Sequence, residues 1–184
     1  GEVLPALLDV CAMMDAYFAQ WDQWIEARPW ADELARLYAM VEGRFPSVDL
    51  EVRVLSAGVS LIFPCFDHPL VARWLSRAEV LLRTSSVPEH HLQLSCFLIA
   101  HAWWAGEPLK IREVSRIATY ALARTSASPL VAFQLHMWIG IGAYSDGHAA
   151  DPALAGHVDQ VLALGEAQGV HLFDSHAWCH NVME

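Results

Sequence analysis

The amino-acid sequence predicts an all-α protein, an α-solenoid in which antiparallel helix pairs stack side by side. Two observations lead to this fold class. Apolar residues recur at helical spacing between short breaks that are rich in proline, glycine and serine. The breaks return about every 40 residues, which is the length of one helix pair in helical-repeat proteins. The alternative is an ordinary helical bundle whose helices have similar lengths by chance.

The whole chain is expected to form a single helical-repeat domain of about eight to nine helices. Four helix pairs are predicted at 4–43, 47–84, 88–125 and 129–169, followed by an unpaired helix at 171–184. The chain begins with Gly1 in place of a methionine and stops at Glu184 inside the last expected helix. These two ends lead us to expect a fragment of a longer protein.

The breaks in the first two pairs contain residues that end and begin helices. Arg28-Pro29 interrupts the apolar stripe of the first helix, and Gly43 is suited to end the second one. Ser47 is a suitable N-cap for the third helix, because its hydroxyl can accept a hydrogen bond from a backbone N–H of the first turn. Pro69 then opens the fourth helix, since proline fits the first helical turn.

The third pair shows the two kinds of helix most clearly. Nearly every residue from 92 to 104 is apolar, which is typical of a helix that is covered on more than one side. Gly106 suits the left-handed backbone that ends a helix, and Pro108 opens the next one. The helix after Pro108 has one apolar stripe, formed by Leu109, Ile111, Val114, Ile117, Ala118, Ala121 and Leu122. First-type helices are therefore expected to be more buried than second-type helices.

The spacing of the breaks supports a repeat. Prolines that open second-type helices are Pro29, Pro69, Pro108 and Pro152, at spacings of 40, 39 and 44. First-type helices open at Ser47, Pro88 and Pro129, at spacings of 41 and 41. A shift of 41 residues places Gln93 on Gln134, Leu94 on Leu135, Ala102 on Ala143, Trp103 on Tyr144 and Gly106 on Gly147. Agreement at one offset favours repetition over chance.

Helix pairs of this length, with small residues at points of close approach, resemble degenerate tetratricopeptide repeats. Trp138, Ile141 and Gly142 fit the Trp-x-x-Leu-Gly opening of that family, although Ser145 replaces its usual aromatic residue. In the preceding pair the glycine position holds His101. The period is similar to the helical-repeat regions of large bacterial ATP-dependent transcription regulators, the group of the maltose activator and other LuxR-type proteins.

This resemblance implies a right-handed superhelix that receives an inducer or a partner protein in the cytoplasm of a bacterium. In that family the repeat region controls a separate ATPase and DNA-binding part. Neither signature occurs here, since the chain has no GxxxxGK[ST] motif and no basic helix-turn-helix. The expected role is therefore that of an interaction or sensor module in signal transduction and transcription regulation.

Composition limits the classes of partner. The formal net charge is −10 with a single lysine, Lys110, so nucleic acid is not expected to bind through this chain. Hydrophobic residues make up 55% of the chain, which raises a membrane protein as an alternative, but no apolar run reaches about 18 residues. The four cysteines are scattered without a CxxC motif, and we expect buried, reduced thiols.

Six polar or aromatic residues of first-type helices are candidates for a concave binding face. They are Gln93, His101, Trp104, Gln134, His136 and Trp138. The resemblance places first-type helices on the inside of the superhelix, and so implies a pocket of aromatic and polar groups. The alternative is that these side chains only fill the spaces between helices.

A histidine cluster near the C-terminus is a weaker candidate for a metal site. His176 and His180 are four residues apart on one helical face, and His171 precedes them. The sequence lacks the HExxH pattern, and a structural histidine pair is the alternative. We therefore expect no metal and no cofactor, and find no motif of nucleophilic catalysis such as GxSxG.

The sequence as a whole favours a non-enzymatic module that binds a protein partner or a small-molecule inducer. A small helical metalloenzyme built on the histidine cluster is one alternative, and a plain scaffold for peptide segments is another. Exposed apolar faces at the two ends of the stack further predict a homodimer.

Overall fold

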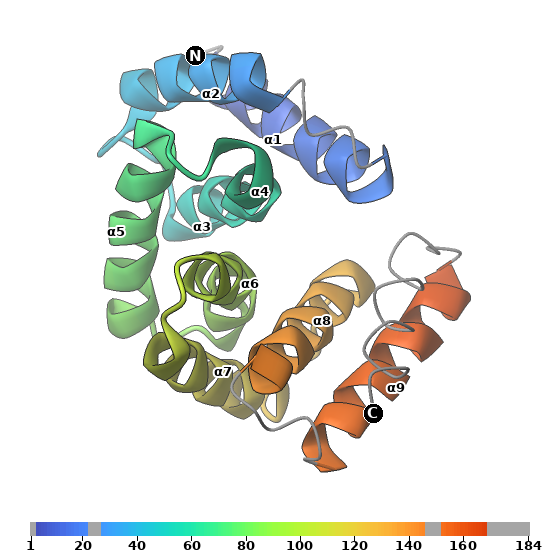
Figure 1. The fold of residues 1–184 in the computed structure, drawn as a ribbon. Coiled ribbons are helices and arrows are strands. Elements are labelled where there is room, and N and C mark those ends of the chain that lie inside the picture. Colours follow the sequence, from blue (N-terminus) through green and yellow to red (C-terminus); the bar gives the residue numbers. More distant parts are fainter. Residues whose placement is uncertain (1–2, 22–26, 146–151, 169–184) are drawn as a thin grey trace.

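The computed structural model describes residues 3–21, 27–145 and 152–168 (Figure 1). Within these residues the chain is helical and has no strand, which confirms the all-α prediction. The elements are α1 (Val3–Trp21), α2 (Ala27–Val41), α3 (Val48–Ser56), the 3-10 helix η2 (Ala57–Leu61), α4 (Ile62–Cys65), α5 (Pro69–Thr84), α6 (Pro88–Trp104), α7 (Pro108–Leu122), α8 (Pro129–Ser145) and α9 (Pro152–Gln168). The predicted helix at 171–184 lies outside the described residues.

Helices α3, α6 and α8 follow one another on the inside of the arrangement, and α2, α5 and α7 lie outside them (Figure 1). Helix α6 packs against α3 on one side and against α8 on the other, and also contacts α5 and α7. The helices predicted as first-type helices are therefore neighbours in space, although loops and an outer helix separate them in the sequence.

The burial of α6 and α7 follows their sequence patterns. In α6, all residues from Leu92 to Ala102 are buried except Gln93 and His101, which are partly buried. In α7 the buried residues are Ile111, Val114, Ala118 and Ala121, which lie on one face. The predicted difference between the two kinds of helix is confirmed for this pair.

Several predicted helix ends are confirmed in atomic detail. The Ser47 hydroxyl accepts a hydrogen bond from the backbone N–H of Leu50, at 3.3 Å, and caps α3. Gly43 and Gly106 have φ angles of 69° and 70°, in the left-handed region that glycine adopts without strain. His68 caps α5 by accepting the N–H of Leu70 on its Nδ1, at 3.1 Å, which the sequence analysis did not predict.

The third helix, which the sequence predicts to begin after Ser47 as the first helix of the 47–84 pair, is not continuous. It is divided into α3, η2 and α4, and the 3-10 turn contains the buried Gly58. A Cβ atom on Gly58 would lie 2.7 Å from the ring of Phe97 on α6, so the backbone approaches the buried ring closely. The interruption therefore lies where this backbone closely approaches a buried ring of a distant helix.

Three cysteines are placed as predicted, because Cys11, Cys65 and Cys96 are all buried. Burial raises the pKa of the Cys65 thiol above its ordinary value, which keeps the thiol protonated. Among the described helices, none combines the length and apolar character that crossing a bilayer requires.

We predict that Gly58→Ala destabilises the fold by about 1–3 kcal/mol, because the added methyl group must displace the fully buried ring of Phe97. Chemical denaturation of both proteins measures this difference. Gly156→Ala on α9 is the matched control, since a Cβ atom there meets no other atom within 4 Å. The control should be neutral or slightly stabilising, and equal losses for both variants would contradict the prediction.

Candidate functional site

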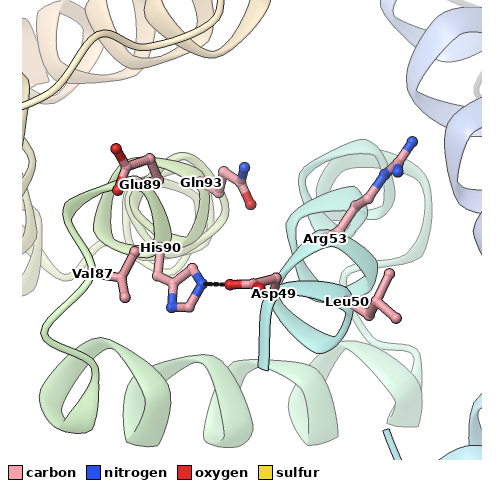
Figure 2. Close-up of a pocket in the computed structure, with 7 residues that line it drawn as sticks. All are labelled: Asp49, Leu50, Arg53, Val87, Glu89, His90 and Gln93. Atoms are coloured by element: carbon pink, nitrogen blue, oxygen red, sulfur yellow. Dashed lines mark hydrogen bonds and ion pairs between the residues drawn. The ribbon is translucent and has the colours of Figure 1, made fainter. Parts of the chain in front are cut away.

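A polar hollow of about 450 Å³ lies between the first turns of α3 and α6 (Figure 2). It is lined by Asp49, Leu50, Arg53, Val87, Glu89, His90 and Gln93. Asp49 and Arg53 are four residues apart on α3, and Glu89 and Gln93 are four apart on α6, so each helix presents two polar side chains from one face. We call this feature the polar hollow.

The floor of the polar hollow is a buried histidine that links three segments. His90 is 5% exposed, and its Nε2 lies 2.6 Å from Oδ1 of Asp49 on α3. Its Nδ1 lies 2.8 Å from the hydroxyl of Ser85, and that hydroxyl oxygen accepts the backbone N–H of Val87 at 3.1 Å. With Asp49 ionised, Nε2–H donates to the carboxylate and Nδ1 accepts from Ser85. Both ring nitrogens are therefore engaged, and the ring fixes α3 against α6.

The side chains above this floor differ in what they bind. Glu89 accepts a hydrogen bond from the hydroxyl of Thr125, and this bond lowers the pKa of the Glu89 carboxyl. Arg53 has no ion pair or side-chain hydrogen bond with any described residue. Arg53 and Gln93 both point to the side that faces away from α5 (Figure 2). The polar hollow thus presents a guanidinium and an amide to solvent above a fixed base.

Of the six predicted binding residues, only Gln93 lines the polar hollow. His101 and Trp104 lie at the other end of α6. The ring of His101 stacks on Phe66, with centroids 4.9 Å apart and planes 11° apart, and Trp104 is 6.4 Å from Phe66 and 47% exposed. Burial, and then the charge of Lys110, lower the pKa of His101. These two residues form a separate aromatic surface.

The three predicted residues of α8 also lie apart from one another. Trp138 is 3% exposed and its ring is 6.1 Å from that of Trp103, so it contributes to packing between α6 and α8. His136 faces α9, where its Nδ1 is 2.8 Å from Nδ1 of His157. Gln134 is partly buried. The structure therefore does not bring the six candidates into one pocket.

The sequence analysis missed most of the polar hollow, because it did not consider Asp49, Arg53 or Glu89 as candidates for a binding face. A usable signal was present, since Asp49 and Glu89 are 40 residues apart, as are Arg53 and Gln93. Equivalent positions of two neighbouring first-type helices thus carry an acid followed by a long polar side chain. That pairing marks one shared face.

The predicted metal-site residues His171, His176 and His180 lie outside the described residues. Within the part of the chain that the structure describes, no group of three or more His, Cys, Asp or Glu side chains converges as metal ligands would.

The His136–His157 pair makes stability depend on pH. Burial, and to a smaller extent the charge of His157, lower the pKa of His136 below its ordinary value of 6.5. With Nδ1 facing Nδ1, one ring donates and the other accepts, so a further proton places two donors against each other. The folded state therefore prefers a neutral His136. The stability that the neutral histidine pair contributes is fully present above the ordinary histidine pKa of 6.5. It is lost as the pH falls through the lower pKa that His136 has in the folded state.

We predict that the unfolding free energy decreases between about pH 7 and pH 5, and decreases less steeply in His136→Gln. Denaturant titrations at a series of pH values measure both slopes. The control is His91→Gln, since His91 is also partly buried but binds the backbone carbonyl of Ser85 at 2.9 Å. An unchanged slope in His136→Gln would show that this pair does not link protons to folding.

Comparison with known proteins gives no neighbour from which to carry over a function. No protein-family model matches the chain, and no curated protein or solved structure shows significant similarity to it. The resemblance to tetratricopeptide-like regulator regions therefore stays a prediction that rests on the residues of this chain.

Proposed function

We propose that this chain is a non-enzymatic binding module that receives an extended segment of a partner protein in the polar hollow. In this proposal the helices are antiparallel pairs stacked as a solenoid, and α3, α6 and α8 form its receiving face. The observation that carries the proposal is the pairing of a rigid floor with free side chains. His90 and Asp49 fix the two helices, while Arg53 and Gln93 extend into the open space above them.

The chemistry of the polar hollow favours a peptide. The Gln93 amide offers both a donor and an acceptor, which matches the donor and acceptor that each residue of an extended backbone presents. Val87 and Leu50 add apolar surface at the edge of the hollow. A fixed floor limits the ordering cost of binding, because the two helices need not be brought together by the ligand.

The same geometry argues against catalysis at this site. The buried ring of His90 could act as a base only on the Ser85 hydroxyl that it already contacts, and the oxygen of that hydroxyl also accepts the backbone N–H of Val87. Small-molecule sites usually enclose most of the ligand surface, whereas the polar hollow is open to solvent. A peptide segment therefore fits better than a small inducer or a substrate.

The proposed biological setting is a cytoplasmic bacterial regulator, as the sequence resemblance implies. Capture of a partner segment between α3 and α6 would favour the helix spacing that binds it best. Binding can change the spacing of the stacked helices only if the segment has a higher affinity for one spacing between α3 and α6 than for another. Helix α6 is suited to that role because it packs against both α3 and α8.

We predict that random peptides displayed for selection against this protein yield binders that require the polar hollow. Gln93→Trp should abolish their binding, because the indole ring of tryptophan is larger than the glutamine side chain and would cover the open space above His90. Thr119→Trp is the matched control, since Thr119 is exposed on the outer helix α7. Binding is measured by titration with the selected peptides, and thermal melts verify that each variant is folded.

Peptides that bind the parent, Gln93→Trp and Thr119→Trp equally would contradict a receiving site at the polar hollow. A selection that yields no peptide dependent on the hollow would count against the proposal in the same way.

A further inference from the structure

We infer that Arg53 is a carboxylate-binding subsite, which selects partner segments that carry an aspartate, a glutamate or a C-terminal carboxylate opposite α3. The inference rests on the proposed function and specifies the chemistry of the partner. It starts from the pairing of charges in this chain, which has 21 acidic residues against 11 basic ones. With acids in such excess, an arginine without an acid partner stands out.

Five arginines bind a carboxylate in the described part of the chain. The pairs are Arg28–Asp67, Arg36–Glu33, Arg73–Glu42, Arg77–Glu51 and Arg83–Glu79. Arg53 and Arg116 have no ion pair and no side-chain hydrogen bond with a described residue. Arg116 lies on the outer helix α7, where it is exposed. Arg53 alone of these two lines the polar hollow.

Arg53 has no ion pair among the described residues, although an acid precedes it by one helical turn. Asp49 precedes Arg53 by four residues, the spacing at which an acid and a base commonly pair on a helix. The Asp49 carboxylate instead lies 2.6 Å from Nε2 of His90 (Figure 2). His90 is held in turn by the Ser85 hydroxyl on its other nitrogen, so the contact between His90 and Asp49 is fixed from both sides of the ring. His90 is therefore a positioning residue for the subsite.

The second acid of the polar hollow is bound as well, since Glu89 accepts the hydroxyl of Thr125. Both carboxylates that line the hollow are thus occupied, and the guanidinium of Arg53 remains available for an external anion. A guanidinium presents a planar set of donors that matches a carboxylate in a bidentate arrangement. The Gln93 amide stands on the opposite helix and can donate to the same group or to the neighbouring backbone (Figure 2).

The surroundings favour a singly charged carboxylate over a phosphate. Asp49 and Glu89 place two negative charges at the rim and floor of the polar hollow. Repulsion from these charges grows with the charge of the ligand, and a phosphate monoester carries nearly two negative charges at pH 7. Among the described residues, one arginine lines the hollow, whereas phosphate sites usually combine several cationic or backbone donors.

The test compares displayed random peptides selected separately on the parent and on charge-reversed variants. We expect an acidic residue at a fixed position in peptides from the parent, and a basic residue at that position in peptides from Arg53→Glu. Arg116→Glu changes the net charge equally on the outer helix and should yield the same acidic preference as the parent. In synthetic copies of one selected peptide, changing the acid to its amide should weaken binding to the parent about tenfold.

Asp49→Asn provides a second variant that keeps Arg53. It removes the negative charge of the acid that precedes Arg53 by one helical turn, so the acidic preference should persist or become stronger, even if the floor of the hollow is loosened.

The outcomes separate this inference from the proposed function. Peptides that need Gln93 but show no acidic preference would overturn the carboxylate subsite and leave the receiving site in place. Selection of the same peptide sequences by the parent and by Arg53→Glu would also overturn the carboxylate subsite. Tighter binding of a phosphoserine peptide than of the matching glutamate peptide would overturn it as well. Absence of any peptide that depends on the polar hollow would overturn the proposed function and with it the subsite.

Discussion

The burial of α6 constrains the rest of the structure, because this helix is covered by α3, α5, α7 and α8. A helix enclosed in this way has few side chains that can reach solvent, and those few must lie in the seams between its neighbours. On α6 these seams expose Glu89 and Gln93 near the first turn, and Trp104 at the end. Any surface that α6 offers to a partner is therefore determined by the spacing of its neighbours.

The same enclosure explains why a histidine forms the floor of the polar hollow. A polar ring at a buried position is costly unless its nitrogens are hydrogen-bonded. His90 meets this requirement with Ser85 from the preceding loop and Asp49 from the neighbouring inner helix. The contact has a consequence beyond satisfying the ring, since it fixes the register of α3 against α6 and occupies the acid nearest to Arg53. One buried contact thus links packing to the charge that the surface presents.

The sequence allowed a prediction of most of the helix pattern, because caps and breaks are local. Ser47 and Gly106 act where they were expected, since a hydroxyl cap and a left-handed turn depend on a few neighbouring residues. The break at Gly58 was not predictable in this way. The backbone there passes close to the ring of Phe97, which belongs to a different helix and lies 39 residues further along the chain. The period indicates that helices repeat, but does not say which backbone approaches which ring.

The candidate site was less predictable than the fold, for a related reason. Gln93, His101 and Trp104 were expected on one concave face because the resemblance places first-type helices on the inside. A helix that is covered by several neighbours, however, opens into different seams along its length. His136 was assigned to a binding face, while its actual neighbour is His157 on α9. Assigning a residue to a face requires the rotation of each helix about its axis. Sequence spacing gives that rotation only to within the width of an apolar stripe.

The charge of the whole chain and the ion pairs inside the polar hollow act on a charged partner at different distances. The net charge of −10 repels an acidic partner at a distance, but exposed charges are screened beyond about 8 Å at physiological ionic strength. Inside that distance, recognition depends on which charges remain unpaired. Asp49 and Glu89 are bound to His90 and Thr125, so the group that an approaching segment meets without a competing internal partner is Arg53. In the proposed function, local pairing would select an acidic segment even on an acidic protein, because Arg53 lines the polar hollow without an acid partner among the described residues.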